Sequence, residues 1–175
     1  MAKLKKQHMT IHWKAIVQDD SSIPATEATL KEKATLVGRI GLMMLSVGTG
    51  AWRVRNSMNK VARCLGITCT ADIGLLAISY TCIEGTDTYT QSISNPTTGV
   101  NTHKLMQLEL FMKEFPDKVS TYSVKHIHEV LDEIQKLPAN YKAWNLGLAS
   151  ALACGAFTFL LGGGPVEMCC AFLGA

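Results

Sequence analysis

Apolar residues recur at helical spacing in four segments of the first 138 residues. The segments are Leu30–Val47, Trp52–Leu65, Asn101–Phe115 and the stretch between Ser123 and Pro138. In each of them apolar side chains follow one another at steps of three and four, which places them on one face of a helix. The pattern predicts four amphipathic helices.

Between the second and third predicted helices, the apolar positions alternate instead. Ile67–Ile73 alternates strictly between apolar and polar residues, as a half-buried strand does. Leu75–Ile83 and Thr88–Ile93 are two further strand candidates, separated by the turn residues 84–87. The order of elements predicts an α+β fold with two helices, a small antiparallel sheet and two helices.

Gly48, Thr49 and Gly50 stand between the first two predicted helices and invite a phosphate-loop interpretation, since glycines let backbone amides approach an anion. The third glycine and the lysine of such a loop are missing, and helical spacing precedes the segment. We therefore interpret it as a helix end followed by a tight turn. Pro116 is expected to stop the third helix, and Ser123 to cap the fourth.

Charged residues are distributed very unevenly along the chain. Residues 1–142 carry 30 of the 31 Lys, Arg, Asp and Glu side chains, and residues 143–175 carry only Glu167. The 24 residues of Ala143–Val166 contain no charge, and about 20 suffice to cross a bilayer as a helix. We predict a transmembrane helix here rather than a buried helix of a soluble domain. Its N-terminus is expected inside, because Lys136 and Lys142 precede it.

This predicted membrane segment is only weakly apolar. Its strongly apolar side chains contribute about −3 kcal/mol in total on an insertion scale, which favours a helix within a bundle over a solitary anchor. Small residues recur every four positions and would form a flat strip for close helix packing, namely Ala143, Gly147, Ala151 and Gly155. We expect the lipid bilayer and further transmembrane helices, or a partner membrane subunit, as neighbours.

A glycine-rich break follows the predicted membrane segment. Gly162, Gly163, Gly164 and Pro165 interrupt the helix, and Glu167 follows two residues after the proline. Met168–Ala175 is apolar but too short to cross, so it is either a re-entrant stub or, as we favour, the start of a segment in a longer polytopic protein. An ionisable group beside a broken helix is a candidate for a solute or ion pathway; the alternative is a loop residue at the membrane surface.

Composition argues against a nucleic-acid partner and a signal peptide, and it supports a division of the chain into three parts. A net charge of +3 does not indicate a nucleic-acid partner, and the basic N-terminus lacks the apolar region of a signal peptide. The six cysteines form no CxxC pair, which favours reduced thiols. We predict a flexible arm at 1–25, a cytoplasmic α+β domain at 26–140, and a transmembrane helix, break and second apolar segment at 141–175.

The sequence offers little enzymatic chemistry. His126, His128 and Glu129 point to different helix faces, and His8 and His12 have no third ligand nearby, so we interpret the histidines as solvated and predict no metal or other cofactor. Ser79, Cys64 and Cys82 have no recognisable paired base, so no catalytic residue is assigned. The basic residues of the second helix could meet anionic headgroups or an anionic solute, or form a solvated face; they are Arg53, Arg55, Lys60 and Arg63.

Four pieces of sequence together resemble one known family. They are LSVGTGAWRVRNSM at Leu45–Met58, Cys64-Leu65-Gly66 before a strand, the region of Tyr141 after a leucine-rich helix, and ACGAFTFLLGGGPVE at Ala153–Glu167. In this order and spacing they resemble the threonine/serine exporter family, the ThrE and YjjP-like group. The Arg53-Val54 pair, Gly162, Gly163 and Glu167 match its motifs, whereas Arg55 and Asn56 stand where the family usually has acidic residues.

The resemblance implies a secondary exporter of small polar metabolites, such as threonine and serine or short dicarboxylates, in the cell inner membrane, and not an enzyme. Glu167, the glycines 162–164 and Arg53 are then the candidate pathway residues. The alternative is a membrane-anchored regulatory or interaction module whose α+β domain binds a partner or ligand.

Overall fold

A computed structural model describes residue 13 and residues 23–95, 99–138 and 141–175, except for the side chain of residue 143. The chain divides into two compact units, Met1–Leu137 and Pro138–Ala175. His8, His12 and most of the predicted arm lie outside the described residues.

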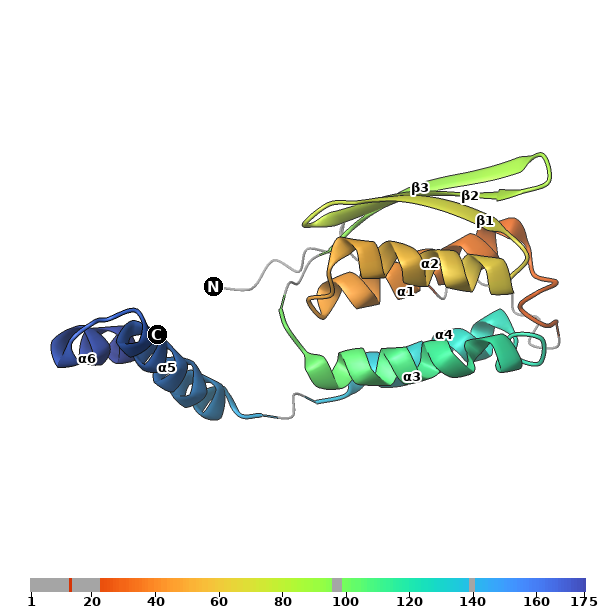
Figure 1. The fold of residues 1–175 in the computed structure, drawn as a ribbon. Coiled ribbons are helices and arrows are strands. Elements are labelled where there is room, and N and C mark those ends of the chain that lie inside the picture. The colour runs from red at the N-terminus through yellow and green to blue at the C-terminus, as the bar shows by residue number, and fades with distance from the viewer. Residues whose placement is uncertain (1–12, 14–22, 96–98, 139–140) are drawn as a thin grey trace, which may run out of the picture. The chain divides into compact units, whose positions relative to one another are not determined.

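The first unit has three layers (Figure 1). Helices α1 (Leu30–Ser46) and α2 (Ala51–Cys64) form the middle layer. An antiparallel sheet of order β1-β2-β3 covers one side of it, and α3 (Thr102–Lys118) and α4 (Val124–Lys136) cover the other. The strands are β1 (Thr68–Ile73), β2 (Ala77–Glu84) and β3 (Asp87–Ser94).

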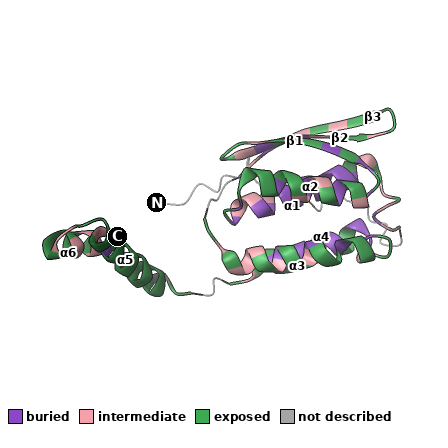
Figure 2. Cartoon of the chain, viewed as in Figure 1, coloured by how far each residue is buried: buried purple, intermediate pink, exposed green. Residues whose placement is uncertain are grey.

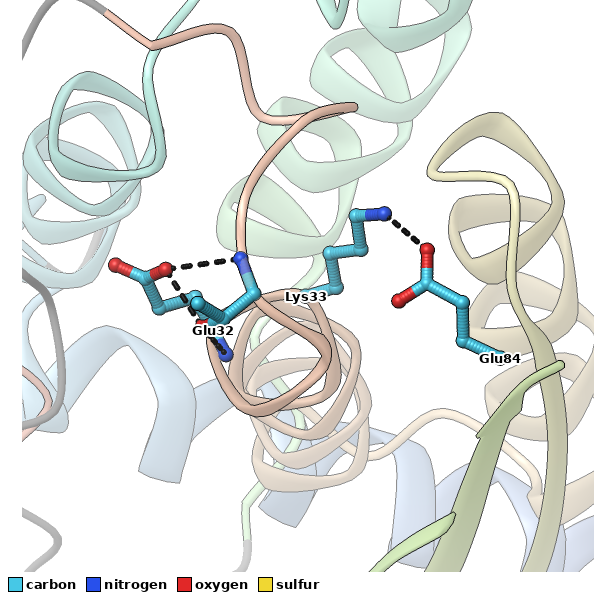
Figure 3. A network of polar contacts seen from close by, with 4 residues as sticks. Glu32, Lys33 and Glu84 are labelled. Carbon is cyan, nitrogen blue, oxygen red and sulfur yellow. Dashed lines mark hydrogen bonds and ion pairs between the residues drawn. The ribbon is translucent and has the colours of Figure 1, made fainter. Parts of the chain in front are cut away.

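Helix α1 is the central element of this unit, buried along most of its length (Figure 2). A capping box starts it: Thr29 Oγ1 accepts from the Glu32 amide at 3.4 Å, and Glu32 Oε2 accepts from the Thr29 amide at 3.1 Å (Figure 3). Lys33 is buried, and its Nζ lies 2.5 Å from Glu84 Oε1 at the end of β2 (Figure 3). This ion pair joins the start of α1 to the sheet.

The turn between α1 and α2 is the helix end that the sequence indicated. Gly48 has φ +86°, its amide donates to Leu45 O at 3.1 Å, and Gly50 is already the N-cap of α2. The interpretation as a tight turn is confirmed.

The sheet alternates as expected, with one face against the helices. Cys69 on β1 and Ile78, Tyr80 and Cys82 on β2 are buried, whereas hydroxyl pairs bridge the strands on the exposed face, Ser79 with Ser92 at 3.0 Å and Thr81 with Thr90 at 2.9 Å. Two residues connect β2 to β3, and Gly85 there has φ +61°.

Helix α3 runs through Pro116 instead of stopping before it, so that prediction was wrong. A proline inside a helix removes the hydrogen bond to the carbonyl four residues earlier, here that of Met112. Lys60 Nζ, from α2, donates to Met112 O at 3.0 Å. A side chain from another helix thus satisfies the carbonyl that the proline leaves without its helical partner.

Helix α4 follows its sequence pattern closely. Ser123 is the N-cap and accepts from the His126 amide at 3.2 Å. The whole predicted stripe is buried against the other layers; it consists of Val124, Ile127, Leu131 and Ile134. Both the cap and the stripe are confirmed.

The second unit is a pair of helices, α5 (Ala143–Leu160) and α6 (Pro165–Leu173), joined by a turn in which Gly162 has φ +87°. The predicted fold class, a cytoplasmic α+β domain followed by a transmembrane segment, was wrong in its last part. None of the helices in the described ranges combines the length and the apolarity needed to cross a membrane.

The physical reason is that the uncharged stretch is not one helix. Only Ala143–Leu160 is continuous, 18 residues or about 27 Å at 1.5 Å per residue, and the rest of the stretch forms the turn and the start of α6. Asn145, Ser150 and Thr158 also dilute the apolar character of α5.

Two glycines of α1 give a test of how tightly the first unit is packed. A Cβ at Gly38 would lie 2.2 Å from Tyr80 Oη, and a Cβ at Gly41 would lie 2.5 Å from Met58 Sδ. Tyr80 is held by a 2.8 Å hydrogen bond to Gln91, whereas a methionine side chain adapts readily. We expect Gly38→Ala to lower the free energy of unfolding by about 1–3 kcal/mol, and Gly41→Ala to cost less.

Chemical denaturation of the two variants measures this order. Gly99→Ala is the control, because a Cβ there meets no described atom within 4 Å. If Gly41→Ala proved the more destabilising, Tyr80 would not be the rigid neighbour of α1 that we infer.

Candidate functional site

The glycine-rich turn of the second unit brings its backbone and Glu167 close together. A Cβ at Gly163 would lie 2.6 Å from Thr158 Cγ2, and a Cβ at Gly164 would lie 2.8 Å from Glu167 Oε2. The Gly163 amide donates to Thr158 O at 2.9 Å. A side chain at position 163 would collide with the backbone of Thr158, so the turn requires glycine there, whereas a side chain at position 164 would displace only the flexible end of Glu167.

Glu167 belongs to the first turn of α6, three residues after the N-cap Gly164 and two after Pro165 at the helix start. A carboxylate is favourable at this position, because the free amides of a helix N-terminus carry partial positive charge. Glu167 is exposed and remains available to a proton, a cation or a polar solute.

The predicted packing strip is divided between two environments. Ala151 is buried, and a Cβ at Gly155 would lie 3.6 Å from Met168 O, so this part of the strip faces α6. A Cβ at Gly147 would meet no described atom within 4 Å. The side chain of Ala143 lies outside the described residues.

Arg53 belongs to α2 of the first unit, whereas the glycine turn belongs to the second unit. It is about half exposed and forms an ion pair with Glu109 of α3. Its neighbours on α2 also bond internally: Arg55 Nε donates to Ala71 O at 3.0 Å, and Lys60 binds Met112 O as described. These cations tie α2 to the sheet and to α3.

A second polar site, which sequence reasoning missed, lies between α1 and α4. The Arg39 side chain is only 2% exposed. Its Nη1 donates to His128 Nδ1 at 2.9 Å and to His128 O at 3.0 Å, and its Nη2 forms an ion pair with Asp132. We call Arg39, His128 and Asp132 the buried polar cluster.

The cluster fixes the protonation state of its histidine. Arginine can only donate, so His128 Nδ1 must accept, and the neutral ring carries its proton on Nε2. Burial, and then the charge of Arg39, lower the pKa of His128 to about 4. Burial also lowers the pKa of Arg39, although Asp132 opposes that shift. The interpretation of His128 as a solvated histidine was wrong, whereas His126 is exposed.

Trp13 covers the cluster. Its ring stacks on His128 with centroids 6.1 Å apart, and the Arg39 guanidinium lies 5.7 Å from its ring centre. Arg39 Nε and His128 Nε2 have no hydrogen-bond partner among the described residues.

A cavity of about 420 Å³ lies in the same unit, lined by residues of α1, α3 and α4 and by the loop before α3. Gln135 connects it to the cluster, because its side chain lies 3.4 Å from Arg39 Nη2 while its carbonyl accepts from Lys104 Nζ at 2.7 Å. Ser46, Asn101 and Lys104 add further polar groups to the lining. The volume and the mixed lining suit a small polar solute.

Arg39 could have been noticed in the sequence. It lies three residues after Leu36 and directly before Ile40, on the apolar stripe of its helix, as His128 lies four residues after Val124. A charged or polar residue on the apolar face of a helix indicates either that this part of the face is exposed or that the side chain has a buried hydrogen-bond partner. The sequence does not show which residue that partner is.

The fold consists of an α+β unit with a polar cluster and a cavity, followed by an apolar helical hairpin. A family model described as "Putative threonine/serine exporter" matches residues 35–175, which include parts of both units. The chain therefore belongs to the threonine/serine exporter family, a family of transporters and not of enzymes. Comparisons with curated proteins and with solved structures gave no match.

The buried polar cluster makes the stability of the first unit depend on pH. His128 has its pKa lowered from 6.5 to about 4 on folding, so its contribution is complete above pH 6.5 and is lost as the pH falls toward 4. As the pH falls, His128 is protonated in the unfolded chain before it is protonated in the folded chain, and this favours unfolding. We expect a loss of up to about 3 kcal/mol in the free energy of unfolding across this window.

Denaturant titrations between pH 4 and 7 give the free energy of unfolding of the natural chain and of His128→Gln. The contribution of His128 is the difference in how these two free energies change with pH. His126→Gln, at an exposed histidine two residues away, is the matched control and is expected to leave the pH dependence unchanged. If His128→Gln retained the full acid sensitivity, other groups would be its source.

Proposed function

We propose that this chain is part of a membrane-located exporter that moves threonine, serine or related small polar metabolites out of the cell without covalent chemistry on the solute. The observation that carries the proposal is the family match over residues 35–175, because it includes most of the polar first unit together with the apolar hairpin.

The hairpin supports a location against an apolar environment. Large apolar side chains are exposed along α5 and beyond it, including Trp144, Phe157, Phe159, Leu160 and Leu161, each more than 60% accessible. Surfaces of this kind mark sites of association with protein or lipid. In this proposal the hairpin packs against helices of the exporter, from a partner membrane subunit or another part of the same protein, and contacts lipid around them.

Glu167 is proposed to serve the solute or ion pathway. The glycine turn holds its carboxylate at the start of α6 and leaves it exposed. Broken helices with helix termini and polar groups at the break are where secondary transporters bind solutes and coupling ions. A carboxylate there can take up and release a proton as the solute moves.

The first unit is proposed to face the cytoplasm and to couple solute supply to export. Its cavity offers a lysine, an asparagine and a serine to a small polar solute. This observation also favours the second candidate function, a regulatory module that binds a solute or partner while the hairpin only attaches it to the membrane. Residues 1–140 expressed alone discriminate between the two, because full partner or solute binding without the hairpin supports the module.

Replacement of the single acidic residue of the second unit, Glu167, tests the pathway. We expect Glu167→Gln to slow the efflux of threonine or serine from loaded cells by about tenfold or more, the effect of losing an interaction of about 1.4 kcal/mol. Glu167→Asp keeps the charge and is expected to retain part of the activity. Radiolabelled amino acid remaining in the cells is the measurement.

Glu129→Gln is the control, since Glu129 is an exposed carboxylate in the first unit. Efflux by Glu167→Gln at the rate of the natural chain, at equal expression, would remove Glu167 from the pathway.

Leucine substitutions on α5 test the proposed helix partners. Gly155 faces α6 within the hairpin, whereas Gly147 has open space around it among the described residues. We expect Gly147→Leu to abolish efflux by blocking an approaching helix while leaving the hairpin folded. Gly155→Leu should abolish efflux and also disturb the hairpin, which helical circular dichroism and protease sensitivity detect.

Ala153→Leu is the matched control, because Ala153 is exposed on another face of α5. Normal efflux by Gly147→Leu would mean that no helix packs on that side.

A further inference from the structure

Two cysteines face each other directly across the sheet of the first unit. Cys69 of β1 and Cys82 of β2 are register partners, and both are free thiols. Both are also buried on the face that packs against the helices, 7% and 0% exposed respectively. Their side chains therefore share one small apolar space.

The hydrogen-bond pattern shows which kind of pair this is. The Gly74 amide donates to Ala77 O at 2.9 Å, so these opposite residues form a hydrogen-bonded pair at the end of the β1–β2 hairpin. Hydrogen-bonded and non-hydrogen-bonded pairs alternate along antiparallel strands. Counting back from Gly74, the fifth pair, Cys69 with Cys82, is of the non-hydrogen-bonded kind.

In such pairs the Cα atoms are about 4.5 Å apart and the side chains approach more closely than in the other kind. Disulfides join residues whose Cα atoms lie about 4.4–6.8 Å apart. The backbone can therefore accept a disulfide between Cys69 and Cys82 without moving the strands.

The two thiols also differ in character. A hydrogen bond from the Cys82 thiol lowers the pKa of Cys69, and the same bond, together with burial, keeps the pKa of Cys82 above its usual range. Cys69 is thus the better nucleophile, and Cys82 the protonated partner. Within the described residues β1 pairs only with β2, so Cys69 lies on an edge strand whose local opening can admit a small oxidant.

We propose that Cys69 and Cys82 are an oxidation site at which a peroxide closes a reversible cross-strand disulfide. The Cys69 thiolate attacks hydrogen peroxide; an S–O bond forms, the O–O bond breaks, and the leaving hydroxide is protonated to water. Cys82 then attacks the sulfur of the sulfenic acid; the S–S bond forms, the S–O bond breaks, and a second water leaves with the Cys82 proton. Two thiols lose two electrons, and the peroxide gains them.

The disulfide would change the mechanics of the first unit. It closes the chain between β1 and β2, and β1 is in turn bonded to α2 through Arg55 Nε and Ala71 O. Oxidation therefore stiffens the sheet against the central helices, and thiol reductants restore the original state.

The test oxidises the full chain with hydrogen peroxide and maps its disulfides by mass spectrometry. Cysteines 154, 169 and 170 are exposed, so the chain carries Cys154→Ser, Cys169→Ser and Cys170→Ser. Cleavage after Arg63 and before Asp72 and Asp87 separates peptide 64–71, with Cys64 and Cys69, from peptide 72–86, with Cys82. We expect these peptides to be linked after oxidation, with the loss of two hydrogen atoms, and to separate after dithiothreitol.

Three variants show which cysteine of peptide 64–71 forms the disulfide. The link between the peptides must persist in Cys64→Ser, and it must be absent in Cys69→Ser and in Cys82→Ser. The midpoint of denaturation should rise on oxidation of the parent chain and stay unchanged in Cys82→Ser. The linkage measurement on the parent chain does not depend on the folding of any pair variant. Oxidation of Cys69 to sulfinic acid without linkage, or a link that requires Cys64, would overturn the proposal.

Discussion

Helix α1 is buried between the sheet and helix α4, and it carries two buried cationic side chains, Lys33 and Arg39, that need hydrogen-bond and ion-pair partners. Lys33 is bonded to Glu84 of the sheet, and Arg39 is bonded to His128 and Asp132 of α4. Removing either partner would leave a buried charge uncompensated, which costs far more than the intact pair contributes. The two ion pairs therefore fix the position of α1 against both neighbouring layers, and the arrangement of the first unit depends on them.

Two glycines of α1 allow the neighbouring elements to pack closely against its backbone. Gly38 and Gly41 leave room for Tyr80 of β2 and Met58 of α2, so that the sheet and α2 approach its backbone. The cavity then lies where α1, α3 and α4 converge, and Gln135 connects it to Arg39. In the proposed function, a solute bound there would lie next to Gln135, which also contacts Arg39.

The second unit differs from the first in that most of its large apolar side chains are exposed. In α5 the apolar side chains surround the helix, and Ala151 and Gly155 are buried where α5 packs against α6. A helix that is apolar all round is stable only where its surroundings are apolar as well. The hairpin thus exposes apolar surface, and its one acidic side chain, Glu167, lies beside the glycine turn.

The sequence by itself determined the element types, the alternating face of the sheet, the Ser123 cap and the turn at Gly48, because each depends on residues adjacent in the chain. It also led to the family, through short motifs that span both units. It did not determine that Arg39 and His128 are buried together, or that α3 continues past Pro116. Those features depend on partners such as Asp132 and Lys60, which are more than fifty residues away, and only the tertiary structure brings them within hydrogen-bonding distance.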